Sequence, residues 1–194
     1  MANTQPLLLN KNKNISPFNI VLLRKHMRSV ADIAYRVSLI CGFSKKTSVK
    51  IYKASLHHDV GKFYWYDGLF TKPNKLLNQL DKEYIYRHPE YSVKYLQYAM
   101  PRWAYNEYLK SDISIIDLIM LHHEKPDGSG YYRIKNIPKE AVVISFADIF
   151  SACIEFRQYK PSMSCSMALN LGLADFKDVF TKEEVKLIKT DLQF

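Results

Sequence analysis

The chain has 194 residues, 47% of them hydrophobic and 24% charged, which is the composition of an ordinary one-domain globular protein and excludes a wholly disordered chain or a disulfide-dependent miniprotein. Its 28 lysines and arginines exceed its 19 aspartates and glutamates, leaving a formal net charge of +9. A charge of this size indicates an anionic partner, such as a nucleotide, a nucleic acid or a membrane surface.

The chain from residue 16 onward is dominated by helical periodicity. Residues 1–15 are rich in Asn, Lys and Gln, and we expect them to form a flexible tail. A Tyr-rich loop ending at Pro73 and a Gly- and Pro-rich loop over 125–138 separate periodic segments, and no convincing run alternates with period two. The sequence therefore predicts an all-α fold, a compact bundle of six to eight helices forming one domain over 16–194. The expected helices run from Ser16–Pro17 to Gly42, from Ser44 to near Gly61, over 81–99 as one or two helices with Pro89 at a joint, and over 111–124, 138–156, 164–171 and 181–192.

The cysteines and the apolar segments bear on location. Cys41, Cys153 and Cys165 are odd in number and widely spaced, which is not the pattern of a disulfide framework. We interpret them as reduced thiols and expect a cytoplasmic protein. The most apolar stretch, 141–154, is interrupted by Asp148, so we expect no membrane span. Near the N-terminus the lysines follow the run of leucines, which is the reverse of a signal peptide.

The histidines are the main candidates for chemistry. One helix and one connection separate successive groups of them, so a bundle could bring the groups to a common point. Asp148 lies in the middle of an apolar helix, where a lone carboxylate is costly unless it is paired or bound to a metal. Taken singly, each histidine is more often a surface or satisfied core residue, and Asp148 could cap a neighbouring helix. Together these donors favour octahedral Fe or Mn over tetrahedral zinc. The six histidines are His26, His57, His58, His88, His122 and His123.

An ordered series of motifs points to a family. The run 57–62 reads HHDVGK and contains the HDxGK signature of HD-domain metal-dependent phosphohydrolases. The run 122–131 reads HHEKPDGSGY and resembles the HHExxDGxGYP motif of the HD-GYP subfamily. The resemblance covers about residues 16–180. Four further runs, TKPNKL (71–76), HPE (88–90), ADIFSA (147–152) and RQYK (157–160), are similar to the subfamily's KPxxL, Hpe, aDxxdA and RPYr elements.

The resemblance implies an HD-domain helical bundle and a metal-dependent phosphodiesterase that hydrolyses a cyclic dinucleotide, foremost cyclic di-GMP, to a linear dinucleotide or to GMP. It implies two divalent ions, Fe or Mn, bridged by Asp59, with Lys62 contacting the scissile phosphate; these two residues are the catalytic candidates. The implied substrate-binding residues are Lys62, Asp127, Tyr131, Arg157 and Lys160. The implied metal ligands are His26, His58 and Asp148 for one ion, and His88, His122 and His123 for the other, with Asp59 shared.

The implied chemistry suits the residue types. A phosphodiester resists attack by water, and two cations held by a bridging carboxylate can stabilise both the attacking and the leaving oxygen. Lys62, one turn beyond Asp59, can neutralise a phosphoryl oxygen as charge develops. The net charge of +9 suits a dianionic substrate.

Three residues depart from the subfamily's pattern. Tyr132 replaces the proline of GYP, a tripeptide associated in the subfamily with partner contacts and activity. Leu22 stands where some members place a glutamate that holds a third metal, so we expect two ions rather than three. His57 replaces an apolar residue, and we interpret it as a partly exposed histidine rather than a ligand.

Two other functions stay open. One is an HD hydrolase that acts on nucleotides or single-stranded nucleic acid, because Lys11, Lys13, Arg24, Lys25 and Arg28 form a basic cluster of the kind that binds phosphate backbones. The other is a module that binds a cyclic dinucleotide without cleaving it. A separate regulatory protein is a further candidate partner.

Overall fold

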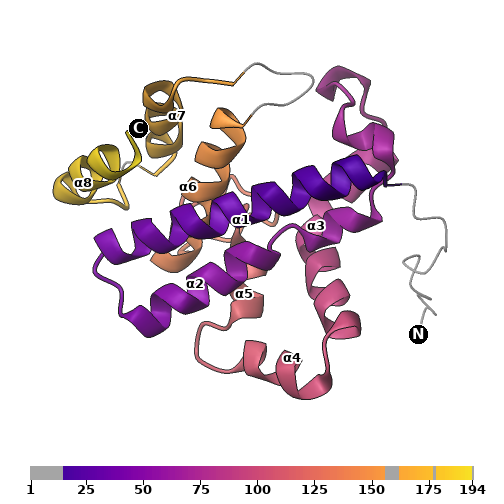
Figure 1. Cartoon of the computed structure of the whole chain (residues 1–194), viewed down its shortest axis with the longest axis horizontal. Helices are drawn as coiled ribbons and strands as arrows, with labels where there is room; N and C mark the ends of the chain where they lie inside the picture. Colours follow the sequence, from indigo (N-terminus) through magenta and orange to yellow (C-terminus); the bar gives the residue numbers. More distant parts are fainter. Residues whose placement is uncertain (1–14, 156–161, 177, 194) are drawn as a thin grey trace.

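The computed structural model describes residues 15–155, 162–176 and 178–193. In these ranges the chain forms eight α-helices and three short 3-10 helices, and it contains no strand, which confirms the all-α prediction (Figure 1). In chain order they are α1 (Pro17–Ile40), α2 (Lys45–His57), η2 (Val60–Tyr64), η3 (Asp67–Phe70), η4 (Asn74–Leu76), α3 (Gln79–Ala99), α4 (Arg102–Leu109), α5 (Ile115–Leu121), α6 (Lys139–Ile154), α7 (Cys165–Ala174) and α8 (Lys182–Leu192).

The first two helices form an antiparallel pair whose ends follow from local chemistry. The side chain of Ser16 accepts a hydrogen bond from the backbone N–H of Asn19, and the next residue, a proline, suits the first helical turn. Ser44 caps α2 in the same way by accepting from Thr47. Between the two helices Gly42 has φ +74°, a conformation that favours glycine. These signals place His26 in the middle of α1 and His58 at the end of α2.

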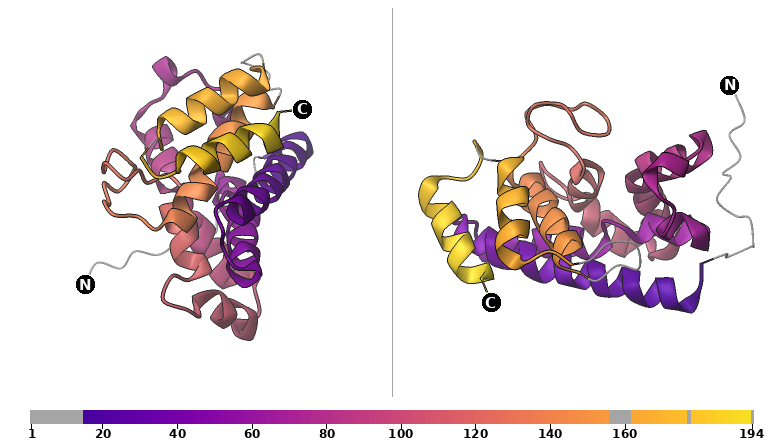
Figure 2. Two further views of the ribbon diagram at one scale, coloured as in Figure 1. Left: turned by 90° about the vertical axis from the view of Figure 1, so that its left-hand side faces the viewer. Right: turned by 90° about the horizontal axis from the view of Figure 1, so that it is seen from above.

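Helix α6 lies at the centre of the core. Most of its residues are buried, including Phe146 and Phe150, as expected of a helix that is apolar around its circumference. Helix α1 crosses α6 (Figure 1), and α2, α5 and α7 also pack against α6. The loop between α5 and α6 stands out on the side of the molecule away from α1 (Figure 2). Asp148 is therefore carried on the most buried helix of the bundle.

The structure differs from the predicted elements in three places. Of the one or two helices expected over 81–99 the structure has one, α3, and this helix continues through Pro89 without a joint. Helix α4 was not predicted, because its N-cap residue, Pro101, makes no side-chain cap hydrogen bond and the helix buries only Tyr108. The Tyr-rich segment up to Pro73 is not a simple loop, because it contains η3 and most of η2, and η4 follows directly after Pro73. These 3-10 helices are too short for periodicity to indicate.

The expected division of the chain into a tail and one domain stays a prediction. Residues 1–14 of the expected tail lie outside the described residues, and Ile15 is buried. In the described part of the chain, no helix is long and apolar enough to cross a membrane.

Candidate metal centre

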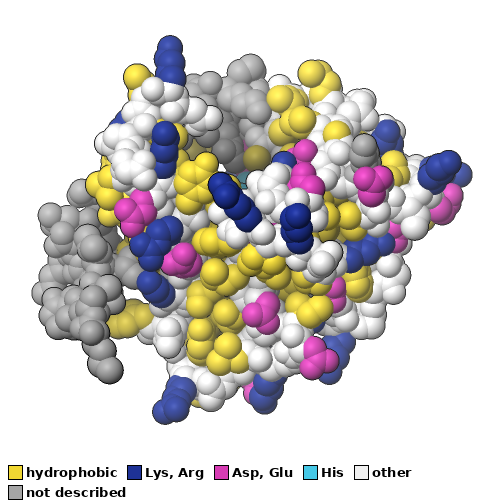
Figure 3. Space-filling model, turned by 180° about the vertical axis from the view of Figure 1, so that it is seen from behind, with side chains coloured by type: hydrophobic (Ala, Val, Ile, Leu, Met, Phe, Trp, Pro, Cys, Tyr) yellow, Lys and Arg dark blue, Asp and Glu magenta, His cyan; other side chains and the backbone are white. Residues whose placement is uncertain are grey.

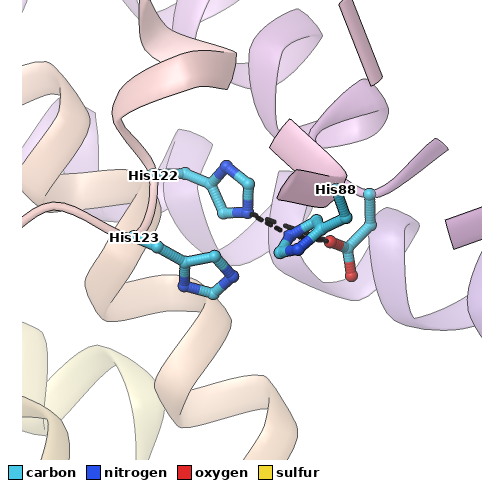
Figure 4. A group of neighbouring side chains, drawn as sticks. His88, His122 and His123 are labelled. Carbon is cyan, nitrogen blue, oxygen red and sulfur yellow. Dashed lines mark hydrogen bonds and ion pairs between the residues drawn. The ribbon is translucent and has the colours of Figure 1, made fainter. Parts of the chain in front are cut away.

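All seven predicted ligand residues converge in the interior of the bundle, in two adjoining sets. Within each set the potential ligand atoms all lie within 4.8 Å of one another. Figure 4 shows the three histidines of the larger set gathered around one point. The four-residue group comprises Asp59, His88, His122 and His123, and the three-residue group comprises His26, His58 and Asp148.

Asp59 faces both groups. Its Oδ1 lies 3.1 Å from Nε2 of His88 and 3.8 Å from Nε2 of His122, in the four-residue group. Its Oδ2 lies 3.3 Å from Nε2 of His58 and 3.8 Å from Nε2 of His26, in the three-residue group. One carboxylate, fully buried, thus presents one oxygen to each side. This is the geometry that a bridging ligand requires.

Asp148 holds the far side of the three-residue group. Its Oδ1 lies 3.0 Å from Nε2 of His26 and 3.8 Å from Nε2 of His58. Its Oδ2 lies 4.0 Å from Nδ1 of His123, so Asp148 also reaches toward the other group. The two groups therefore form one continuous cluster of imidazoles and carboxylates.

Three of the histidines are oriented by backbone carbonyls that the local fold leaves without a helical N–H partner. The Nδ1–H of His58 donates to Ser55 O, and that of His122 to Ile119 O, each at 2.6 Å. Both carbonyls lie in the last turn of a helix, where no helical N–H follows. Nε2 of each ring is thereby left free to bind a cation.

His88 obtains its carbonyl in a different way. Its Nδ1–H donates to Ile85 O at 2.6 Å, in the middle of α3. In a regular helix this carbonyl would accept the N–H of Pro89, but proline has none. Pro89 thus leaves the carbonyl of Ile85 free to accept the Nδ1–H of His88 and so to orient that ring. A proline inside the helix therefore helps to position a ligand.

Burial and charge favour the protonation states that bind metals. Burial, together with the positive charge of Lys62, lowers the pKa of His88. Burial and the neighbouring His88 lower the pKa of His123 to about 3. Burial alone would raise the pKa of Asp59, but His58 and Lys62 hold it well below the ordinary value. Neutral imidazoles and ionised carboxylates are the ligating forms.

His26 is the exception among the histidines. Burial by itself lowers its pKa, yet the hydrogen bonds to Asp148 and Glu155 raise the pKa to about 9. Without a cation at the site, a proton on this ring compensates the nearby carboxylates. A cation bound at Nε2 would take the place of that proton.

Two buried atoms test whether the residues fit a metal. Among the described residues, Nε2 of His58 and Oδ1 of Asp59 are buried and make no hydrogen bond of acceptable geometry. Buried polar atoms without partners are rare and costly. Both atoms point into the cluster, where a cation would satisfy them, so the cluster could bind metal.

Lys62 lies beside the cluster. Its Nζ is 2.5 Å from Oδ2 of Asp59, and its side chain is 18% exposed. Nζ also lies 5.3 Å from the ring centroid of Trp65. The lysine therefore stands at the border between the buried cluster and solvent, with its charge next to Asp59.

The loop after His123 is held by a buried glutamate that the sequence did not single out as structural. Glu124 is fully buried, and its carboxylate accepts the backbone N–H groups of Tyr132 at 2.7 Å and Ile134 at 2.8 Å. Proline at position 132 would lack the first of these donors. Gly130 passes so close to the chain that a Cβ would lie 2.6 Å from the carbonyl oxygen of His123. The replacement of the GYP proline by Tyr132 thus adds a hydrogen bond to this loop.

The same loop lines a hollow beside the metal cluster. The cavity measures about 490 Å³ and is lined by Tyr86, Ser129, Gly130, Tyr131 and Arg133. The ring of Tyr131 lies 4.4 Å from that of His123 and 4.7 Å from that of Tyr86. Tyr131 is therefore the link between the hollow and the four-residue group.

On the face drawn in Figure 3, almost no histidine surface is visible, in keeping with the burial of the cluster.

Of the remaining predicted residues, Asp127 and His57 lie outside the metal cluster. Asp127 is exposed, and its carboxylate accepts the N–H of Ser129, so it shapes the loop and does not join the metal cluster. His57 is outside both groups; its Nδ1–H donates to Lys53 O at 2.9 Å. Arg157 and Lys160 lie outside the described residues.

Comparison with known proteins identifies the family. A family model described as an HD domain matches residues 8–172. The chain belongs to the HD-domain family. Among its curated relatives, the 3'3'-cGAMP-specific phosphodiesterase 1 of Vibrio cholerae is 29% identical over 150 residues, 76% of this chain and 32% of that protein. The cyclic di-GMP phosphodiesterase response regulator RpfG of Xanthomonas campestris is 31% identical over 147 residues, 74% of this chain and 36% of that protein. These relatives confirm the HD-GYP resemblance, and the chain spans about a third of their length.

Solved structures of HD-domain proteins share the fold. Bd1817, an HDG"Y"P protein from Bdellovibrio bacteriovorus, matches with a TM-score of 0.64 and 17% identity, covering 88% of this chain and 52% of that one. The HD domain of the phosphodiesterase PgpH from L. monocytogenes, in complex with cyclic-di-AMP, matches with a TM-score of 0.58 and 19% identity, covering 88% and 87%.

Proposed function

We propose that this HD domain is a metal-dependent phosphodiesterase that hydrolyses a cyclic dinucleotide, with cyclic di-GMP as the first substrate to test. The observation that carries the proposal is Asp59, whose two oxygens face two separate groups of ligand atoms. The curated relatives support the substrate class, since their names include cyclic di-GMP and 3'3'-cGAMP phosphodiesterases. The free thiols of all three cysteines support a cytoplasmic location.

The proposed cofactor is a pair of divalent ions, Fe or Mn. The four-residue group would hold one ion and the three-residue group the other, with Asp59 shared. Mixed imidazole and carboxylate donors without thiolates suit these metals. When bound, the pair would supply positive charge to the phosphodiester and to the attacking water. A third ion is not expected, because Leu22, one turn before His26, has an exposed hydrocarbon side chain with no lone pair that could bind a cation.

The residues around the cluster would bind and orient the substrate. Lys62 stands at the solvent border and would neutralise charge on the scissile phosphate. Tyr131 and Tyr86 flank the neighbouring hollow, where an aromatic base could stack. We keep Arg157 and Lys160 as proposed contacts to phosphate or base.

Product chromatography tests the proposal. Anaerobically purified protein is incubated with cyclic di-GMP, 3'3'-cGAMP, cyclic di-AMP and a single-stranded oligonucleotide in separate reactions, and its metal content is measured by elemental analysis. We expect close to two Fe or Mn per chain and a linear dinucleotide or mononucleotide from at least one substrate. Tight binding of a cyclic dinucleotide without product would instead establish a non-hydrolysing binding module. Cleavage of single-stranded nucleic acid alone would establish the other HD-hydrolase alternative.

A second experiment tests the proposed substrate contacts. Arg157→Ala and Lys160→Ala should each raise KM by about 10- to 150-fold while metal content stays at the wild-type value, because charge-assisted hydrogen bonds to phosphate contribute about 1.5–3 kcal/mol. Equal loss of metal in these variants, or an unchanged KM, would show that the placement is wrong.

A further inference from the structure

We propose that Glu155 is a positioning residue for the metal centre and acts through His26, which it orients so that Nε2 faces the shared cluster. This inference rests on the proposed metal centre and assigns a role to a residue that no motif in the chain indicates. The contact joins two residues 129 positions apart in the sequence.

The geometry around Glu155 is specific. Its Oε2 lies 2.9 Å from Nδ1 of His26, and its Oε1 accepts the hydroxyl of Ser151 at 2.8 Å. The Ser151 hydroxyl oxygen lies 2.9 Å from that of Ser29, on α1. Both carboxylate oxygens are therefore fixed, one by the histidine and one by a hydroxyl that is itself tied to α1.

The backbone explains why His26 needs a side chain for this purpose. His58, His88 and His122 each donate Nδ1–H to a carbonyl three residues earlier. Those carbonyls are available because each lies in the last turn of a helix or four residues before a proline, which has no N–H to donate. His26 lies in the middle of the 24-residue helix α1, where the carbonyls of the preceding turn accept the helix's own N–H groups. An acceptor for its Nδ1–H must therefore come from another element.

Glu155 supplies that acceptor from the end of α6. The same helix carries Asp148, two turns earlier, whose Oδ1 lies 3.0 Å from Nε2 of His26. The imidazole is thus held between two carboxylates of one helix, one on each ring nitrogen. With Nδ1–H directed to Glu155, Nε2 is the atom presented to Asp148 and Asp59. A carboxylate in this position also raises the basicity of the ligand nitrogen, and losing such a partner typically weakens metal affinity about 10- to 100-fold.

If Glu155 acts on the metal through His26, its variants should affect metal affinity in a pattern that a purely structural contact between α1 and α6 would not produce. Glu155→Gln keeps an oxygen that accepts Nδ1–H, whereas Glu155→Ala removes it. In addition, Glu155 can matter for the metal only while His26 is present. A double-mutant cycle with His26→Ala measures this dependence.

The experiment measures Mn²⁺ affinity of the full chain by competition with a chelator, together with thermal unfolding of the metal-free forms. We expect Glu155→Ala to weaken one of the two Mn²⁺ sites about 10- to 100-fold and to leave the other near wild type. Glu155→Gln keeps an acceptor for Nδ1–H but loses the negative charge, so it should weaken that site less than Glu155→Ala does. Glu183→Gln, a control on an exposed glutamate of α8, should match wild type. Adding Glu155→Ala to His26→Ala should cause little further loss.

Three results would overturn the inference: wild-type affinity in Glu155→Ala, equal weakening of both sites, or additive losses in the double variant. If Glu155→Ala does not fold, Ser151→Ala provides the second test, because it frees one carboxylate oxygen while keeping the glutamate; the same single site should weaken. The outcome is separable from the proposed function. A wild type that binds two Mn²⁺ but yields no product contradicts the phosphodiesterase proposal and leaves the role of Glu155 standing.

Discussion

Substituting Gly61 by alanine should disturb the metal centre without touching a ligand. Gly61 lies in η2, directly after Asp59 and Val60, and packs on the backbone of α3. Its N–H donates to the Ser92 hydroxyl at 2.8 Å, and that hydroxyl donates to His58 O at 2.6 Å. This contact therefore sets the distance between the segment that carries the HD pair and the helix that carries His88.

The size of the effect follows from the space available. A Cβ at Gly61 would lie 2.2 Å from the carbonyl oxygen of His88 and 2.5 Å from the backbone N of Ser92. Both are main-chain atoms, so η2 and α3 must separate by about 1 Å to restore ordinary van der Waals contact. Overpacking of this kind costs roughly 1–3 kcal/mol of unfolding free energy. A displacement of about 1 Å between reacting groups costs on the order of 100-fold in rate.

The assay compares Gly61→Ala with Gly68→Ala, a matched control in η3. At Gly68 the nearest atom to a Cβ would belong to the ring of Tyr66, at 3.3 Å, so the contact is longer than at Gly61 and involves a side chain rather than the main chain. Urea unfolding, Mn²⁺ affinity and turnover are measured for both. We expect losses in all three for Gly61→Ala and values near wild type for Gly68→Ala. Wild-type Mn²⁺ affinity and stability in Gly61→Ala would refute the reasoning that this close approach sets the ligand geometry.

Three further outcomes are expected. Tyr132→Pro should lose the N–H that the buried Glu124 accepts and destabilise the protein by about 1.5–3 kcal/mol, whereas Tyr132→Phe keeps that donor; equal unfolding free energies of the two variants would contradict this. The hydrogen bonds from Lys72 and Tyr66 lower the pKa of Asp81 from 3.8 to about 2. Because the folded state favours the ionised carboxylate, this stabilisation is present above pH 3.8 and is lost as the pH falls through 2. Asp81→Asn should therefore be less stable than wild type near neutral pH, and the difference in unfolding free energy should shrink toward pH 2. A difference that does not change with pH would contradict this prediction. Excess Mn²⁺ should raise the unfolding free energy by about 2.7 kcal/mol per site at about 100 times its Kd, and a chelator should reverse the rise; no change in melting temperature would argue against metal binding by the folded state.

Much of the fold could be predicted because the signals are local. Ser16 and Ser44 cap α1 and α2, and the Gly- and Pro-rich segment at 125–138 does form the loop before α6. The motifs also selected side chains that the fold brings together, including His58 and Asp148. Helix α4 escaped prediction because its stabilising contacts are few and it has no capping residue.

The supporting residues could not be predicted because their partners are remote in sequence or belong to the backbone. Glu155 contacts His26 across 129 positions, and no pattern within α6 indicates that partner. Glu124 could be read as a candidate ligand beside His123, yet it binds two backbone N–H groups of the following loop. Asp127 matches a motif position but is exposed, because its carboxylate completes a turn with Ser129.

Asp59→Asn, measured for metal content and hydrolysis in the same sample, tests the central claim most directly. The amide keeps the shape of the side chain but not the negative charge that two cations would share. Asp178→Asn, on an exposed aspartate, serves as the control. We predict that Asp59→Asn stays helical by circular dichroism, retains fewer than two ions per chain and forms no product from any of the three cyclic dinucleotides, while the control matches wild type. Turnover near the wild-type rate by purified Asp59→Asn would contradict the account.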